Sequence, residues 1–389
     1  MTITSFNPKH RLLMGPGPSP IYPSVLHALS RPTIGHLDPL FIEMMEEVST
    51  LLKYTFQTDN KATFAISAPG SAGMEAAFVN MIEPGDKVLV CINGVFGQRM
   101  KENIFRCRGI PIEVNNNWSE QTDLASIEEV LNRDPEIKIL AFVHAETSTG
   151  VMNDAKAIAE LGKKFGCLVI ADCVTSLAGI PVEVDSWGID VAYSGSQKCL
   201  SCVPGLSPIT FSEQALKKIA QKKEKVQSWF LDLNLLGEYW LDADQKTKKK
   251  RSYHHTAPVN QLFALHEALV VVQNIGLSRL YEKHQKAYKL LNENLNAIGI
   301  KYVVKDENYR LPMLNHIYIP EGIDDISFRQ TLLNDYNLEI GSGLGTFLGK
   351  TWRVGLMGFG TNEENVITCI SVIKKVLEQQ GYYLNQSII

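Results

Sequence analysis

The sequence predicts an α/β protein with a large domain built on a mostly parallel sheet and a smaller C-terminal α+β domain. Between residues 60 and 212, short apolar runs alternate with segments whose apolar residues recur at helical spacing. Strands separated by helices indicate crossover connections between parallel strands. The chain of 389 residues is also too long for one small core, which indicates at least two domains.

Seven short apolar runs are expected to form the large sheet. They occupy residues 62–67, 87–92, 110–114, 139–145, 167–172, 190–196 and 206–212. The last run follows the previous one after only a short loop, so it could be an antiparallel member of the sheet. Ligands are expected at the carboxyl ends of the parallel strands.

Beyond residue 260, two long helical patterns each end at a glycine, and shorter strand and helix patterns follow them. The helices are expected at 261–276, 277–299, 325–335 and 363–380, and the strands at 314–320, 338–343 and 351–357. The predicted organisation is therefore an N-terminal arm (1–20), a large domain (21–260) and a small C-terminal domain (261–389).

Composition excludes several classes of partner. The net charge is −4 and the isoelectric point is about 6.2, so the chain has no basic field that would attract nucleic acid or an anionic membrane. The N-terminus lacks the features of a signal peptide, and no apolar run is long enough to span a membrane. The seven cysteines are irregularly spaced. We expect a soluble, cytoplasmic protein with reduced thiols that acts on small metabolites. Two lysine-rich segments, 216–225 and 245–251, are expected to be solvated surface rather than an anion-binding patch.

The segment SAPGSAGMEAAF, residues 67–78, follows a predicted strand and opens a predicted helix. The backbone amides around Gly70 and Ser71 would then point out of a helix N-terminus, which suits a phosphate group. The segment has neither the lysine of a nucleotide P-loop nor the glycine spacing of a dinucleotide fold. An ordinary strand-to-helix turn is the alternative.

Asp172 ends the strand pattern CLVIAD, at the edge where α/β proteins place their sites. A carboxylate there could cap the next helix. Alternatively, it could stabilise a protonated heterocyclic nitrogen, as a pyridoxal cofactor requires.

Lys198 lies in SGSQKCLSC, residues 194–202, just past another strand. The segment could be a structural turn, a metal or redox site built on Cys199 and Cys202, or a loop whose reactive group is the lysine amine. A structural zinc site normally needs four ligands, and no second C-x-x-C pair accompanies this one. Because the loop carries little other charge, partial burial would lower the pKa of Lys198 and favour a nucleophilic amine.

Motifs along nearly the whole chain carry a family resemblance. They are LLMGPGPSP, MEAAFVNMIEPGD, NGVFGQR, ETSTGV, SGSQKCL, YHHTAPV and WRVGLMG. Through them the chain resembles the class V, fold type I, pyridoxal-phosphate aminotransferases, and most of all the alanine–glyoxylate and serine–glyoxylate or serine–pyruvate group. The resemblance implies a homodimer with pyridoxal 5′-phosphate as cofactor and a mostly parallel sheet of the seven-stranded type.

The resemblance also implies roles for residues that would contact the cofactor ring. Lys198 would bind the cofactor covalently, and Asp172 would pair with its ring nitrogen. Phe96, where the animal alanine–glyoxylate enzymes have tryptophan, and Val174 would pack on the two ring faces. Thr147 would contact the ring oxygen.

The phosphate of the cofactor would be held by the amides of Gly70 and Ser71 and by Gln197. Tyr253 and Thr256 would reach the phosphate from a partner subunit, although SYHHTAPV could also be a simple turn before a helix. The family usually has a small polar residue where this chain has Pro69, which removes a hydroxyl and an amide contact.

The substrate carboxylate would be bound by Arg353, since an arginine inside an apolar strand needs an anion. A structural ion pair is the alternative role for Arg353. His36 is expected to line the site or serve structure rather than act as a second base. The expected reaction is a ping-pong transfer from alanine or serine to glyoxylate or pyruvate.

Several alternatives stay open. Hydroxykynurenine or 2-aminoethylphosphonate could be the amino donor. A pyridoxal-phosphate cysteine desulfurase would need a nucleophilic cysteine late in the chain, where the only candidate, Cys369, lies within a helical pattern. A metal or redox protein and a non-enzymatic binding module are the remaining alternatives.

Overall fold

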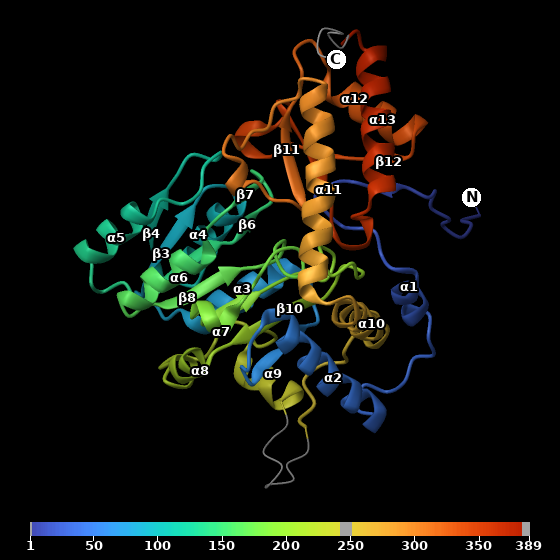
Figure 1. The fold of residues 1–389 in the computed structure, drawn as a ribbon. Coiled ribbons are helices and arrows are strands. Elements are labelled where there is room, and N and C mark those ends of the chain that lie inside the picture. The colour runs from blue at the N-terminus through green and yellow to red at the C-terminus, as the bar shows by residue number, and fades with distance from the viewer. Residues whose placement is uncertain (1, 242–250, 383–389) are drawn as a thin grey trace.

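The large sheet of the protein has seven strands in the order β2-β10-β9-β8-β5-β3-β4 (Figure 1). The computed structural model describes residues 2–241 and 251–382. Neighbouring strands pair in parallel, except that β10 runs antiparallel to both β2 and β9. The strands are β2 (Ala62–Ile66), β3 (Lys87–Ile92), β4 (Ile110–Asn115), β5 (Ile139–Val143), β8 (Leu168–Asp172), β9 (Val191–Tyr193) and β10 (Ser207–Phe211). The predicted α/β class, the mostly parallel sheet and the antiparallel last strand are confirmed.

Helices surround this sheet and connect its parallel strands (Figure 1). Those of the first 241 residues are α1 (Pro23–Leu29), α2 (Pro39–Phe56), α3 (Gly70–Met81), α4 (Val95–Arg106), α5 (Leu124–Arg133), α6 (Ala155–Lys164), α7 (Val184–Trp187), α8 (Glu213–Ala220) and α9 (Leu233–Trp240). Several of them begin at a side-chain cap, such as Asp123 before α5 and Asp154 before α6, which satisfies amides that the helix leaves free. Apart from β4 at the edge of the sheet, the strands between the helices are almost fully buried, as expected for a parallel sheet covered on both faces.

The C-terminal part contains a three-stranded antiparallel sheet in the order β11-β14-β13. Its strands are β11 (Leu314–Tyr318), β13 (Gly341–Ser342) and β14 (Thr351–Gly355), and its helices are α11 (Leu277–Ala297), α12 (Asp325–Asp335) and α13 (Glu363–Gln379). Short 3₁₀ turns occupy Glu307–Tyr309, Gly345–Phe347 and Gly358–Gly360. Figure 1 shows α11 running from the large sheet up to this upper part of the molecule.

The buried hydrophobic residues form two clusters. The larger one surrounds the seven-stranded sheet and includes α10 (Val259–Ile275) and the start of α11. The smaller one contains the rest of α11 and the C-terminal elements, together with Met14 of the N-terminal arm. That arm forms β1 (Leu12–Leu13), which pairs in parallel with β12 (Leu338–Glu339). The N-terminal arm therefore packs with the C-terminal part.

Two predicted strands are each divided in the structure. The run 139–145 gives β5 and then β6 (Ala145–Glu146), which leaves the large sheet and pairs with β7 (Val151–Met152). The run 338–343 gives β12 and β13, which pair with β1 and β14 respectively. In both cases the chain changes partners at the edge of a sheet, and an apolar pattern does not record such a change.

Of the two lysine-rich segments, 216–225 lies on the surface, where Lys217 and Lys218 pair with acidic side chains. Residues 245–250 of the second segment lie outside the described residues. Among the helices that the structure describes, none is long and apolar enough to cross a membrane.

Candidate active site

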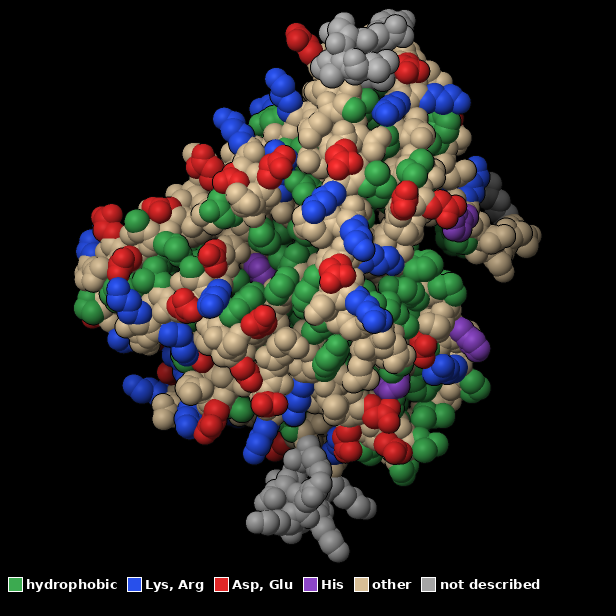
Figure 2. All heavy atoms as spheres, viewed as in Figure 1, with side chains coloured by type: hydrophobic (Ala, Val, Ile, Leu, Met, Phe, Trp, Pro, Cys, Tyr) green, Lys and Arg blue, Asp and Glu red, His purple; other side chains and the backbone are tan. Residues whose placement is uncertain are grey.

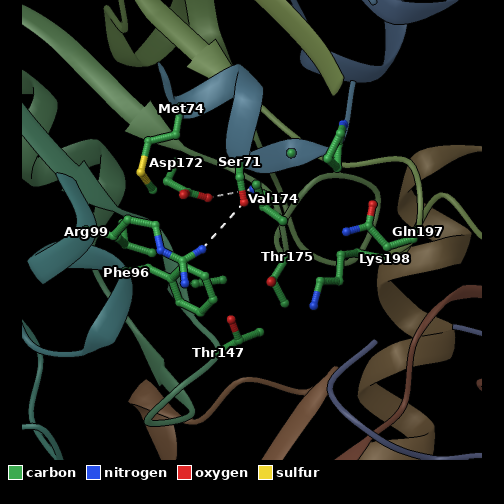
Figure 3. A pocket seen from close by; sticks show the side chains of 14 residues that line it. Ser71, Met74, Phe96, Arg99, Thr147, Asp172, Val174, Thr175, Gln197 and Lys198 are labelled. Atoms are coloured by element: carbon green, nitrogen blue, oxygen red, sulfur yellow. Dashed lines mark hydrogen bonds between the residues drawn. The ribbon is translucent and has the colours of Figure 1, made fainter. Parts of the chain in front are cut away.

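A pocket opens at the carboxyl edge of the large sheet, beside the N-terminus of α3 (Figure 3). Eight of the residues predicted to contact the cofactor line it. They are Gly70, Ser71, Phe96, Thr147, Asp172, Val174, Gln197 and Lys198. Figure 3 shows Asp172 and Lys198 extending into the cavity from opposite sides. Residues separated by as much as 128 positions meet here because the strands before them end at one edge of the sheet.

Lys198 follows β9 and is largely buried in the loop before β10. Its amine donates a hydrogen bond to the carbonyl of Pro16, which belongs to the N-terminal arm. Burial, and secondarily the charge of Arg353, lowers the pKa of Lys198 from 10.5 to about 8. Gly17 approaches so closely that a Cβ atom there would lie 2.7 Å from the Nζ atom, and its φ is +111°. The arm can cover Lys198 only because this residue is glycine.

Asp172 is the last residue of β8 and is 4% exposed. Its carboxylate accepts one hydrogen bond, 2.9 Å long, from the backbone N–H of Val174. Burial is the main reason that its pKa rises from 3.8 to about 7. Tyr193 on β9 pairs with Asp172 in the sheet, and its nearby hydroxyl lowers the pKa of Asp172. That buried hydroxyl makes no hydrogen bond of normal geometry to a described residue. A cation in the pocket would stabilise the ionised form of Asp172.

The N-terminus of α3 forms one wall of the pocket. Pro69 is the N-cap and makes no side-chain capping bond, so the first amides of the helix depend on other partners. Gly70 lies so near Val174 that a Cβ atom would be 3.3 Å from its Cγ2 atom. Across the pocket, the buried Oε1 atom of Gln197 finds no partner among the described residues. The amides at the start of α3 are suited to an anion, whereas the Oε1 atom of Gln197 is an acceptor and needs a hydrogen-bond donor.

Phe96 lies in the first turn of α4, and a buried carboxylate holds it there. Glu146, which is 0% exposed, accepts hydrogen bonds from the amides of Phe96 and Gly97 at 3.1 and 3.3 Å, and from the hydroxyl of Ser148. Burial raises the pKa of Glu146, while these donors lower it in part. Glu146 was not among the predicted site residues, although a carboxylate within the buried motif HAETSTG must find such donors.

Arg99 was also not predicted as a site residue, although it ends the motif NGVFGQR. It lines the pocket, its guanidinium lies 4.9 Å from the centre of the Phe96 ring, and its Nη1 atom is 3.5 Å from the hydroxyl of Ser71 (Figure 3). The neighbouring Glu102 pairs with Arg106 instead, and no ion pair to Arg99 occurs within the described ranges. An uncommitted cation therefore lies beside the N-terminus of α3.

Arg353 lies on β14, is 7% exposed and is not among the residues that line the pocket directly. It donates to the carbonyl of Ser342 at 2.7 Å and to the carbonyl of Thr147 at 3.2 Å, and Thr147 does line the pocket. Burial lowers the pKa of Arg353 to about 10. No carboxylate pairs with it in the part of the chain that the structure describes, so the structural ion pair considered above is not formed there.

Tyr253 and Thr256 do not line the pocket of their own chain. Both are exposed and precede α10 in a segment without regular structure. His36 also lies outside the pocket lining, where its Nδ1 atom is 3.1 Å from the hydroxyl of Tyr239.

The cysteines considered for other chemistry are buried. Cys199 and Cys202 are 2% and 0% exposed, and burial raises the pKa of each to about 12. Cys369 is 0% exposed within α13. In the described ranges, no group of three histidine, cysteine, aspartate or glutamate side chains is arranged to hold a metal ion.

Comparison with known proteins identifies the family. Residues 20–366 match the family model of class V aminotransferases. Alanine–glyoxylate aminotransferase of Rattus norvegicus is 36% identical over 368 residues, which cover 95% of this chain and 88% of the relative. The chain belongs to the class V aminotransferases. It is thus a transaminase, and members of this family use pyridoxal 5′-phosphate.

Solved structures of family members share the whole fold. The crystal structure of an alanine–glyoxylate aminotransferase from Nostoc sp. has a TM-score of 0.93 and 43% identity, and the match covers 97% of this chain and 98% of that one. A ureidoglycine–glyoxylate aminotransferase from Bacillus subtilis also has a TM-score of 0.93, with 33% identity and coverage of 99% and 97%.

The pocket of this aminotransferase fits pyridoxal phosphate on its own chemistry. Among the described residues, the Asp172 carboxylate accepts one hydrogen bond, and Arg99, beside the amides at the start of α3, has no counter-ion. A phosphate group and a protonated ring nitrogen are the complements of such groups.

Proposed function

We propose that the protein is a pyridoxal 5′-phosphate-dependent transaminase that moves an amino group from alanine or serine to glyoxylate or pyruvate by a ping-pong mechanism. One observation carries the proposal. A single pocket combines a lysine amine of lowered pKa, a buried aspartate and a helix N-terminus. The relatives named above support the same reaction class.

The residues of the pocket would hold the cofactor in one orientation. The phosphate would lie at the N-terminus of α3, against Ser71 and Gln197. A phosphate monoester carries a charge of about −1.5 to −2 at neutral pH, of which a helix N-terminus offsets about half a charge. Arg99 would supply a full positive charge beside Ser71. Asp172 would pair with the ring nitrogen, while Phe96 and Val174 would enclose the ring.

The bound cofactor supplies an aldehyde that carries the amino group and a ring that accepts an electron pair. Lys198 would hold that aldehyde covalently until the substrate amine replaces it. With a pKa of about 8, roughly one-tenth of the lysine is neutral at pH 7. The released neutral amine would then remove the proton from the substrate Cα atom. Thr147 would contact the ring oxygen.

Arg353 would bind the substrate carboxylate. Its Nε and Nη1 atoms are already held by two carbonyl groups, which fixes the plane of the guanidinium. A carboxylate in that plane would gain two parallel hydrogen bonds and would offset a buried charge. This explains why an arginine of lowered pKa is placed beside Thr147.

The functional unit would be a homodimer in the cytoplasm. Tyr253 and Thr256 are exposed and lie outside their own pocket, which leaves them available to complete the pocket of the partner subunit. Tyr253 is 64% exposed.

The acceptor is better supported than the donor. The names of both structural relatives include glyoxylate, but one names alanine and the other ureidoglycine as donor. Alanine or serine is our proposed donor, and ureidoglycine is the second candidate. Hydroxykynurenine and 2-aminoethylphosphonate are the donors to compare with them.

The test is a half-reaction assay. Purified protein loaded with pyridoxal phosphate is mixed in turn with each of these donors, and the absorbance of the cofactor is followed. Alanine or serine should convert it to the amine form, and glyoxylate should restore it. Failure of wild-type protein to take up the cofactor would refute the proposal. If only ureidoglycine converts the cofactor to its amine form, ureidoglycine is the donor in place of alanine or serine, and the protein is still a transaminase.

A further inference from the structure

A second cavity, of about 540 Å³, lies behind the strand segment that carries the active site. Val143 and Ala145 line the active-site pocket, whereas His144 between them lines the second cavity. Successive side chains of an extended segment point to opposite faces, so one stretch of backbone serves both spaces. Figure 2 shows the surface hollowed close to the place that Figure 1 labels β6. The cavity is within the size range of small-molecule sites.

Two polar side chains that line this cavity are buried without partners. His144 is 4% exposed and Tyr288, on α11, is 6% exposed. The Nδ1 atom of His144 and the hydroxyl of Tyr288 find no hydrogen-bond partner among the described residues. Arg310 is near enough to influence the pKa of Tyr288, but its guanidinium is not within hydrogen-bonding geometry of the phenol. Buried polar groups are nearly always bonded, and leaving them unpaired is costly.

Most of the charged groups around the cavity are engaged within the protein; the exception is Lys156, which is 61% exposed and lies 3.9 Å from the exposed Glu160. Arg310 donates to the carbonyl groups of Val304 and Lys305 and pairs with Glu307 at 2.9 Å. The carboxylate of Asp154 caps α6 by accepting from the amide of Ala157. Burial lowers the pKa of His144 to about 4, so its ring is neutral near pH 7. An uncharged ligand suits such a cavity better than an anion or a cation.

Aromatic side chains give the cavity flat walls. Trp187, at the end of α7, meets the ring of His144 edge-on, with ring centres 5.6 Å apart. Tyr288 and Tyr309 also line the space. Aromatic walls favour planar ligands, and the unpaired imidazole and phenol groups favour ligands with hydrogen-bonding atoms in the ring plane.

We propose that this cavity is a binding site for a neutral, flat heteroaromatic molecule of nucleobase or nucleoside size, which pairs with His144 and Tyr288 and packs against Trp187. Such a ligand would touch α7 of the large-sheet part and α11 of the C-terminal part. The site does not depend on the proposed transaminase reaction, because none of its residues lines the active-site pocket.

Ligand-observed NMR on the full-length, cofactor-loaded protein tests the inference. The probes are adenine, uracil and nicotinamide, with benzoate as a flat anionic control. At least one neutral probe should bind, and Tyr288→Phe or His144→Phe should weaken it by about fivefold, the effect of one lost hydrogen bond. Tyr302→Phe is the matched control, because the hydroxyl of Tyr302 bonds to Asn315 and lies outside the cavity lining; it should bind like the wild type.

The inference is overturned if no neutral probe binds at millimolar concentration, if neither variant weakens the binding, or if benzoate binds as well and responds to the same variants. Thermal unfolding shows that the variants are folded. The Tyr288→Phe midpoint should equal or exceed that of the wild type, since the change removes an unpaired hydroxyl.

Discussion

Replacing Lys198 by methionine should make the cofactor-free protein more stable, although it removes the amine on which the proposed chemistry depends. The pKa of Lys198 falls from 10.5 to about 8 because the charged amine is buried. This difference corresponds to roughly 3 kcal/mol of folding free energy lost to burial of the charge. The hydrogen bond to Pro16 returns about 1 kcal/mol. The expected gain at pH 7 is therefore about 2 kcal/mol.

The gain should depend on pH in a defined direction. Because the folded pKa lies below the unfolded one, the folded protein binds fewer protons between about pH 8 and pH 10.5. The wild type therefore gains stability as the pH rises through this window. Below pH 8 the full cost of burying the charged amine is present. The advantage of Lys198→Met should shrink as the pH rises toward 10.5.

Urea unfolding of cofactor-free wild type and variant at pH 7 and pH 10 measures both effects. Lys164→Met is the matched control, because Lys164 is 64% exposed; it should change the free energy of unfolding by no more than about 0.5 kcal/mol. A Lys198→Met protein that is less stable than the wild type at both pH values, or a difference that does not change with pH, would refute the reasoning.

Three further predictions concern the other groups of the site. Arg99→Gln should lower the affinity for pyridoxal phosphate about tenfold or more, as expected for one charged hydrogen bond, but leave the affinity for pyridoxal unchanged. Titrations of the cofactor-free protein measure both affinities, and an equal loss for both ligands would mean that Arg99 has a structural role. Arg353→Lys should lower kcat/KM for amino acids by roughly 30-fold or more at unchanged cofactor affinity, and an unaltered kcat/KM would exclude the carboxylate role. Mixing Lys198→Ala subunits with Tyr253→Ala/Thr256→Ala subunits should restore roughly a quarter of wild-type activity if two subunits share each site, whereas no recovery in a mixed dimer would contradict sharing.

The strands of the large sheet were predictable because each is a short, almost fully apolar run between turns. β3, for example, has the bounds of the apolar run 87–92. The partners of a strand were less predictable. Ala145 ends the apolar run that contains β5, but together with Glu146 it pairs with β7, and only the geometry of the sheet edge decides this.

The convergence of the cofactor residues followed from topology and family resemblance together. Asp172 ends β8 and Lys198 follows the neighbouring parallel strand β9, so their approach could be expected from the fold class. Glu146 could not be assigned in this way. It binds the amides of Phe96 and Gly97 about 50 positions earlier, and the sequence shows only that a carboxylate in an apolar segment needs donors. The cover that Pro16 forms over Lys198 is likewise a long-range contact.

The second cavity left no mark in the sequence pattern. His144 appears as one more residue of an apolar strand, and Tyr288 fits the buried face of a long helix. Their unpaired atoms become visible only when the contacts of each are known.

Reduction of the cofactor-loaded protein with borohydride, followed by mass spectrometry of its peptides, tests the central claim most directly. Borohydride converts a covalent link between an aldehyde cofactor and a lysine into a stable bond. The peptide that contains Lys198 should carry the pyridoxyl group, and the same peptide of Lys198→Met should not. A cofactor fixed to another lysine, or to none, would contradict the proposed site.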